Sequence, residues 1–154
     1  MAILNVESTF SDDNKKYEFT GVKLILPNGK TLYEIRSLRN FGNIHKGDIG
    51  GFIEGEHNLS HMGDCWVKDH AMIFDYAFVC GNSIIGENAK IFGDAIIRDN
   101  AKIDGNAKIY GKTIVSDNVW IFGNAEFGFE KMIEIKGNRS IGCTEIFPIP
   151  ETMK

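Results

Sequence analysis

The sequence predicts an all-β protein in which short strands stack into a parallel β-helix. Three observations support this prediction: a large apolar residue recurs at every sixth position, a small residue stands two positions before it, and a turn pair precedes the small residue. A period of six fits no α-helix, whose apolar residues recur every three or four positions. Self-similarity at a short, fixed period is typical of stacked repeat structures.

Eleven such hexads follow one another without interruption between residues 63 and 127. The large apolar positions are Val67, Ile73, Val79, Ile85, Ile91, Ile97, Ile103, Ile109, Val115, Ile121 and Phe127. The positions two before them are Cys65, Ala71, Ala77, Ser83, Ala89, Ala95, Ala101, Ala107, Thr113, Val119 and Ala125. Residues two apart on a strand face the same way. We therefore expect both sets to point inward, the small residues where two faces converge.

The turn pairs that open the hexads are rich in Gly, Asp and Asn, as in Gly93-Asp94 and Asp99-Asn100. These residue types tolerate the left-handed backbone conformation that a sharp corner needs. Each hexad is therefore expected to form one short strand and one corner.

The hexads resemble the hexapeptide repeats of left-handed parallel β-helices, in which three hexads make one triangular coil. The resemblance implies left-handed winding, and eleven hexads would make about four coils. Each buried Ile or Val would contribute about 1.5–3 kcal/mol. Both ends of such a column need a cover, because open sheet edges invite aggregation.

The residues before the array predict an N-terminal β-hairpin cap. Residues 16–36 contain two runs rich in β-branched, aromatic and leucine residues, separated by the turn Pro27-Asn28-Gly29. A Gly-rich stretch then leads into the first hexad. We assign residues 1–62 to the cap and entry segment and residues 63–127 to the hexapeptide-repeat β-helix.

The last segment, residues 128–154, is predicted to hold an out-of-phase final coil and a C-terminal tail. Ile133 and Ile135 are followed by a hexad that restarts two residues out of phase. Ile141 and Phe147 would complete the last partial coil, before two prolines, Pro148 and Pro150, stop the strands.

The stretch "GDIGGFIEGEHNLSHMGDCWVKDHA" carries a more specific resemblance. It is similar to the entry segment of the YdcK-like hexapeptide-repeat proteins of bacteria and phages, which are often labelled transferases on the basis of fold alone. The matching residues are Gly50, Gly51, Phe52, Asn58, Leu59, Ser60, Gly63, Asp64, Cys65, Trp66 and Val67. The resemblance implies no catalytic residue that can be carried over to this chain.

Charge and composition exclude several classes of function. The net charge is −4, from 17 basic and 21 acidic side chains without a basic cluster, so binding to nucleic acid is not expected. No apolar run approaches the roughly 20 residues of a membrane span. Cys65, Cys80 and Cys143 are widely spaced and read as reduced thiols, and the first residues lack the pattern of a secretory signal. We expect a cytoplasmic protein.

Catalysis is disfavoured by the pattern of the repeats. The best-known enzymes of this fold are acyltransferases, usually trimeric, in which a His acts as general base. His70 is the one His within the hexads and the one catalytic candidate, with a solvated turn residue as the alternative interpretation. His57 and His61 are four apart but have no third ligand, so neither a metal nor a cofactor is expected. The uninterrupted array also offers no long loop to build a pocket.

The outward positions predict an apolar edge, if three hexads make one coil. Three aromatic residues would stack as a ladder on one side of this edge, and three apolar residues would line the other side. These interface residues are Phe74, Phe92 and Tyr110, followed round the corner by Phe78, Ile96 and Ile114. A second outward set, Trp66, Ile84 and Trp120, would form another contact face or lie beneath the cap. The apolar edge itself would serve as an oligomer or partner interface, unless the cap or the C-terminal segment covers it.

The sequence therefore predicts a non-catalytic, homo-oligomeric binding or scaffold protein. It would form a dimer or a trimer and bind a macromolecular partner, most readily a protein. A phage-encoded inhibitor of a host defence factor is one form of this hypothesis. The alternative is an acyltransferase-like enzyme that acts at subunit interfaces.

Overall fold

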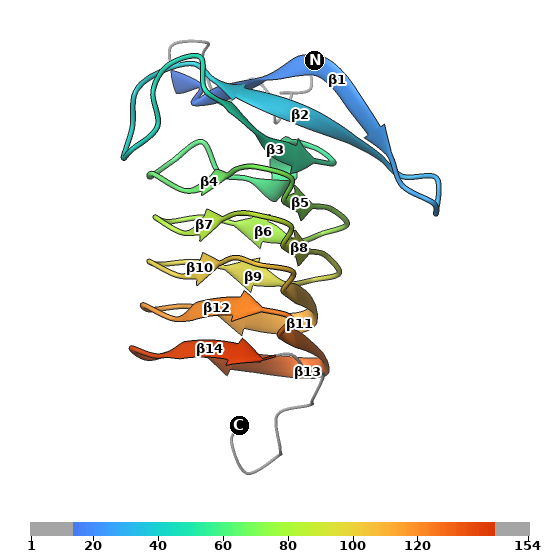
Figure 1. Ribbon diagram of the computed structural model, residues 1–154, viewed down its shortest axis with the longest axis vertical. Coiled ribbons are helices and arrows are strands. Elements are labelled where there is room, and N and C mark those ends of the chain that lie inside the picture. Colours follow the sequence, from blue (N-terminus) through green and yellow to red (C-terminus); the bar gives the residue numbers. More distant parts are fainter. Residues whose placement is uncertain (1–13, 144–154) are drawn as a thin grey trace, which may run out of the picture.

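The computed structural model describes residues 14–143, which form a parallel β-helix beneath a β-hairpin cap (Figure 1). The predicted all-β fold is confirmed. No helix within these residues is long and apolar enough to cross a lipid bilayer.

The cap is a small antiparallel sheet at the N-terminal end of the column. Strand β1 (Tyr17–Ile25) pairs with β2 (Thr31–Ser37), and β2 pairs with β3 (Ile49–Ile53). The turn between β1 and β2 is closed by a backbone hydrogen bond from Leu26 N–H to Lys30 C=O. This is the hairpin that the two apolar runs predict.

The column has three faces, each a stack of parallel strands. Face A consists of β3, β5 (Met72–Ile73), β8 (Lys90–Ile91) and the first parts of β11 (Lys108–Val115) and β13 (Glu126–Ile135). Face B consists of β6 (Phe78–Val79), β9 (Ile96–Ile97) and the second parts of β11 and β13. In the coil above β6, a short 3-10 helix (Glu56–Asn58) leads to Leu59, which forms a parallel bridge with Val79. Face C consists of β4 (Trp66–Val67), β7 (Ile84–Ile85), β10 (Lys102–Ile103), β12 (Trp120–Gly123) and β14 (Ser140–Cys143).

Consecutive coils are offset by 18 residues along the chain. Ile85 pairs with Ile103, and Ile103 pairs with Ile121. Faces A and C each carry five strands, which is more than eleven hexads alone supply, because β3 adds a strand above the hexads and β14 adds one below. In the last coil Val115 pairs with Ile135 and Ile121 pairs with Ile141, so the offset between paired residues there is 20. Phe147, Pro148 and Pro150 lie outside the described residues.

The interior of the column contains the two sets of residues that the period predicts. Every one of the eleven large apolar positions is at most 2% exposed, and every one of the eleven small positions is at most 1% exposed. Two further side chains of the last coil, Ile133 and Ile135, continue the core at 5% and 2% exposure.

The corners depend on a residue with positive φ at the first position of every turn pair. These φ values run from 53° at Glu87 to 70° at Gly63. Five of the eleven residues are Asp or Glu rather than Gly. Their carboxylates form hydrogen bonds down the column, as where the N–H of Glu87 donates to Asp69 Oδ2 at 3.0 Å. The acidic side chain thus gains a bond that offsets part of the cost of the left-handed conformation.

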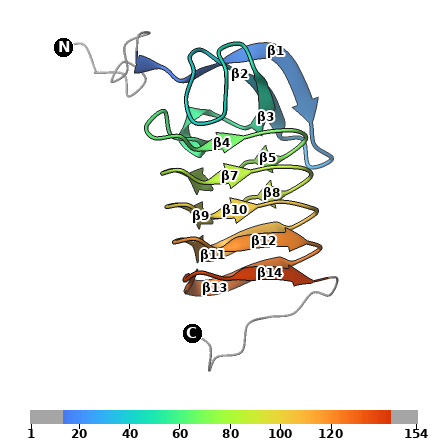
Figure 2. The same ribbon diagram turned by 60° about the vertical axis from the view of Figure 1, so that its left-hand side comes forward.

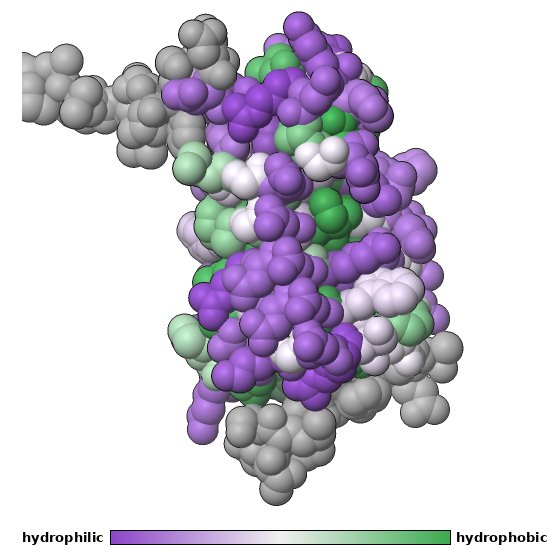
Figure 3. Space-filling view, turned by 90° about the vertical axis from the view of Figure 1, so that its left-hand side faces the viewer, coloured by the Kyte–Doolittle hydropathy of each residue, from purple (hydrophilic) through white to green (hydrophobic). Residues whose placement is uncertain are grey.

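Asparagine side chains form ladders at the second position of the corners. Asn82 Nδ2 donates to Asn100 Oδ1 at 3.4 Å, and Asn118 Nδ2 donates to Asn138 Oδ1 at 2.6 Å. These residues lie on the edge between faces B and C. Figure 3 views the column from this side and shows a hydrophilic band with hydrophobic side chains on both sides of it.

The cap supplies hydrogen-bond donors to the first coil, above which no further coil lies within residues 14–143 (Figure 2). Tyr17 Oη donates to Leu59 C=O at 2.6 Å, and Lys16 Nζ donates to Cys65 C=O at 2.6 Å and to Gly63 C=O at 3.2 Å. Buried carbonyl groups without a partner are costly. Tyr17 and Lys16 therefore provide hydrogen-bond partners for carbonyl groups at the upper end of the column.

Ile91 points into the core and Lys90 points outward, so we predict that truncating each to Ala lowers the free energy of unfolding by a different amount. Ile91→Ala should lower the free energy of unfolding by about 2–5 kcal/mol, because it leaves a cavity in the core. Lys90→Ala, one residue earlier and directed outward, should change it by less than about 0.5 kcal/mol. Urea titrations followed by circular dichroism measure both, and equal losses would contradict the inward assignment.

Candidate functional site

Three aromatic side chains stack along the end of face A, as the sequence predicts. The ring centroids of Phe74 and Phe92 lie 5.0 Å apart with their planes at 2°, and those of Phe92 and Tyr110 lie 4.8 Å apart at 7°. The hydrogen bond from Tyr110 Oη to the Glu126 carboxylate, 2.7 Å long, fixes the lower ring and raises the pKa of Tyr110. The ring at the lower end of the ladder is therefore tied to the next coil by a hydrogen bond.

A second column of apolar side chains lies across the corner from the ladder. Phe78 pairs with Ile96 and Ile96 with Ile114 at the start of face B. All three are partly exposed, whereas on the ladder Phe92 and Tyr110 are partly exposed and Phe74 is only 8% exposed. The six predicted residues thus line both sides of one edge.

Two exposed side chains extend this edge and were missed by the sequence analysis. Tyr76, at the corner between Phe74 and Phe78, is 81% exposed, and Met132, at the same corner of the last coil, is 72% exposed. Tyr76 stands at the second position of a turn pair, where a polar residue is expected, and Met132 lies in the out-of-phase coil, outside the eleven hexads. We name this set the apolar edge: Phe74, Tyr76, Phe78, Phe92, Ile96, Tyr110, Ile114 and Met132.

The cap covers only the upper end of the apolar edge. Leu26, Pro27 and Asn28 of the hairpin turn line a groove together with Met72, Phe74 and Lys90 of face A. This contact accounts for the burial of Phe74. The alternative in which the cap covers the whole edge does not hold, because Phe92, Ile96 and the residues below them remain partly exposed.

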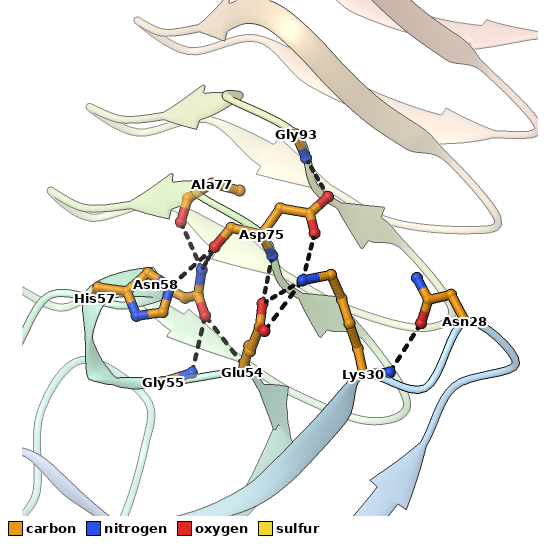
Figure 4. A network of polar contacts seen from close by, with 9 residues as sticks. All are labelled: Asn28, Lys30, Glu54, Gly55, His57, Asn58, Asp75, Ala77 and Gly93. Atoms are coloured by element: carbon orange, nitrogen blue, oxygen red, sulfur yellow. Dashed lines mark hydrogen bonds and ion pairs between the residues drawn. The ribbon is translucent and has the colours of Figure 1, made fainter.

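Polar contacts pin the hairpin to the corner next to Phe74 (Figure 4). Lys30 Nζ lies 3.2 Å from Glu54 Oε2 and 3.1 Å from Asp75 Oδ1. Glu54 also accepts the backbone N–H of Asp75 at 2.8 Å, and Asp75 Oδ2 accepts the N–H of Gly93 at 3.0 Å. These two carboxylates raise the pKa of Lys30. The network has a structural role: it joins the cap to the first two coils.

The other two edges of the column are polar at their corners. One carries Asp64, Asn82, Asn100, Asn118 and Asn138, and the other carries His70, Asn88, Asn106 and Asn124, all exposed. The corner residues of the edge between faces A and B differ from these, because they include the exposed Tyr76 and Met132.

The second predicted contact set does not form one surface. Trp66 is 1% exposed and lies beneath the cap, where its ring meets those of Tyr17 and Phe41 edge-on. This is one of the two alternatives that the sequence left open. Ile84 is packed against the core, and Trp120 is 40% exposed.

Trp120 is held within its own face. Its indole Nε1 donates to Asp104 Oδ2 at 3.0 Å, Lys102 Nζ lies 5.0 Å from its ring centroid, and the ring packs on Phe122 at 4.7 Å. Strands β7 and β10 lie between Trp120 on β12 and Trp66 on β4, so the two rings do not form a stripe on face C.

The four histidines are not brought together. His70 lies exposed at a corner, and His45 is exposed in the entry segment. His57 and His61 do not share a site, because His57 Nε2 contacts Asp75 C=O at 2.9 Å and His61 Nε2 contacts Glu56 Oε1 at 2.7 Å. Among residues 14–143, no group of three His, Cys, Asp or Glu side chains is arranged to hold a metal ion.

His61 belongs to the junction between the cap and the first coil, a role that no sequence pattern indicated. It is 5% exposed and stacks on Tyr17 with the ring centroids 4.1 Å apart. Its Nδ1 accepts the backbone N–H of Lys16 at 3.1 Å, so the proton of the neutral ring lies on Nε2, which donates to Glu56. Burial lowers the pKa of His61, and the bond to Glu56 offsets this only in part.

Cys65 and Lys16 meet inside the same junction. Lys16 Nζ lies 3.2 Å from Cys65 Sγ and 5.0 Å from the centroid of the Phe41 ring, and both residues are 0% exposed. Burial lowers the pKa of Lys16 and raises that of Cys65, so the thiol keeps its proton at neutral pH. A buried, protonated thiol is a core group rather than a nucleophile.

Comparison with models of known protein families and with characterised proteins found no match. The resemblance to the YdcK-like proteins therefore stays a prediction that rests on the residues of the entry segment. The candidate site is defined by its geometry alone.

The buried, neutral His61 predicts that stability falls in mild acid. Because the pKa of His61 is lower in the folded chain than its ordinary value of 6.5, the folded state binds fewer protons than the unfolded state. The stabilisation from His61 is full above pH 6.5 and is lost as the pH falls below it.

The measurement is the midpoint of urea unfolding at several pH values between about 5 and 8. His61→Gln should lower the midpoint at pH 7 and flatten its dependence on pH. His70→Gln, at an exposed corner, is the matched control, and its urea midpoint should depend on pH as that of the wild type does. If the urea midpoint of His61→Gln depended on pH as strongly as that of the wild type, the assignment of a buried, neutral His61 would be contradicted.

Proposed function

We propose that the chain is a non-catalytic, homo-oligomeric binding or scaffold protein that self-associates through the apolar edge. The observation that supports this proposal is the cluster of large, partly or fully exposed apolar side chains that follows the edge between faces A and B over several coils. Soluble monomers rarely leave a long contiguous apolar patch open to water. A second copy of the chain would bury this edge.

The rigidity of the apolar edge favours binding. Its backbone is hydrogen-bonded to the coils above and below, and its aromatic rings already stack on one another. Little side-chain freedom is then lost on association, so more of the gain from apolar burial appears as affinity.

The surface outside the apolar edge is available to a macromolecular partner, most readily a protein. The described groove beneath the hairpin turn is small, and the corners of the other edges present hydrogen-bonding amides. Such a surface suits recognition of another folded surface better than enclosure of a small ligand. Inhibition of a host defence factor by a phage protein is one use of such a binder, supported only by the sequence resemblance.

A double substitution on the apolar edge tests self-association. Phe92→Asp with Ile96→Asp places two carboxylates on adjacent sides of the corner, where burial against a second copy would be costly. The molar mass in solution, measured by sedimentation equilibrium, should fall from that of an oligomer to that of a 17.2 kDa monomer. Both side chains point outward, so the circular dichroism spectrum should stay that of the wild type.

The matched control adds the same number of carboxylates to a polar edge, as Asn88→Asp with Asn124→Asp. This variant should keep the mass of the wild type. A monomeric wild type, or an oligomer that survives Phe92→Asp with Ile96→Asp, would contradict the proposal. Binding of acetyl coenzyme A that is lost in His70→Ala would instead favour the acyltransferase-like alternative.

A further inference from the structure

We propose that the second copy packs on the apolar edge upside down, so that the oligomer is a two-fold dimer of antiparallel columns. This inference rests on the proposed self-association and specifies its symmetry. It is carried by the order of charged and apolar side chains along the corner of the edge.

The corner residues change in character from the top of the column to the bottom. The corner positions of successive coils are Tyr76, Asp94, Lys112 and, in the widened last coil, Glu130, Lys131 and Met132. Asp94 and Lys112 are both exposed and stand at equivalent positions one coil apart. An acidic corner thus lies directly above a basic one, in the middle of the apolar edge.

The symmetry of the oligomer decides which of these charges meet. A symmetry axis parallel to the column, in a dimer or a trimer, brings each coil against the same coil of the other copy. Asp94 would then face Asp94, and Lys112 would face Lys112. Like charges brought together at an interface disfavour that arrangement.

A two-fold axis across the edge, midway between the coils of Asp94 and Lys112, gives the opposite result. Each Asp94 then faces Lys112 of the other copy, so the dimer gains two complementary pairs. The same inversion sets Phe92 against Tyr110 and Ile96 against Ile114. It also sets Tyr76 against the corner that carries Met132, and thioether–aromatic contacts are favourable.

The two ends of face A differ, and the same inversion brings one against the other. At the top, the hairpin turn projects over Phe74. At the bottom, Gly128 occupies the ladder position and bears no side chain, and an added Cβ would lie 2.1 Å from the Tyr110 ring. An antiparallel partner places the projecting hairpin of each copy opposite the lower end of the ladder of the other, where the Tyr110 ring lies over Gly128. Lys90 and Lys108 stand on the far side of the ladder from the corner and do not enter these pairs.

Charge reversal distinguishes the two symmetries. Asp94→Lys alone and Lys112→Asp alone should each raise the dissociation constant about tenfold or more, because each brings like charges together at two places in an antiparallel dimer. The combined swap, Asp94→Lys with Lys112→Asp, should restore an affinity close to that of the wild type. In a parallel oligomer each reversal only replaces one like-charge contact by another, so affinity would not change and the inference would be overturned.

Disulfide trapping gives a second, independent readout. Adjacent coils are about 4.8 Å apart, so in the antiparallel dimer the two Tyr76 positions are separated by about three coils, or 14 Å, along the columns. That is too far for a disulfide, which needs Cα atoms within about 7 Å. Tyr76→Cys should therefore not link to itself, whereas a mixture of Tyr76→Cys and Met132→Cys should form a mixed disulfide, identified by mass spectrometry of the linked peptides.

The outcomes separate this inference from the proposed function. If the wild type is a monomer, both fail. If the wild type is an oligomer that Phe92→Asp with Ile96→Asp dissociates, but Tyr76→Cys links to itself, the edge is the interface and only the antiparallel arrangement is overturned.

Discussion

The register of one coil on the next is the constraint on which the rest of the structure depends. Backbone hydrogen bonds join each residue to those about 18 positions later, as from Ile84 N–H to Ala101 C=O at 3.0 Å and from Lys90 N–H to Ala107 C=O at 3.0 Å. The step of 18 is three hexads, so equivalent positions of successive coils lie in columns. A residue type that recurs every six positions must then occupy all three faces alike, which is why a single pattern of Ile and Ala fills the whole interior.

The same register turns outward side chains into ladders. Phe74, Phe92 and Tyr110 stack because the strands that carry them pair without slippage, and asparagines at the corners bond to one another for the same reason. Where successive coils carry like residues, as in this ladder and in the asparagine corners, the surface is similar from one coil to the next. The two departures from the 18-residue step lie at the ends, where the first coil widens around Lys16 and the last coil widens to carry Met132.

The repeat predicted the part of the structure that is periodic. The burial of Ile97 and the stacking of Phe92 on Tyr110 follow from counting positions, because each depends only on the register. The non-periodic contacts could not be predicted in this way. Trp66 occupies an outward position, yet it is buried because Tyr17 and Phe41 of the cap pack on it, a contact between segments with no shared period. Five corner positions carry Asp or Glu, although Gly adopts positive φ with less strain. The hydrogen bond that each of these carboxylates accepts from a backbone N–H of the next coil can be seen only in the folded structure.

A column whose backbone is fully paired can be recognised only through its side chains and its ends. The ladder repeats an aromatic ring from coil to coil, so a partner that slides by one coil meets a similar stack, and the affinity of the ladder alone would not fix the register. The corner between faces A and B breaks that uniformity, since Tyr76, Asp94, Lys112 and Met132 differ from coil to coil. Charges seldom add much affinity at an exposed rim, but they exclude wrong registers at a cost of several kcal/mol. On this edge the apolar groups would therefore supply the affinity, and the pair of opposite charges would select one alignment.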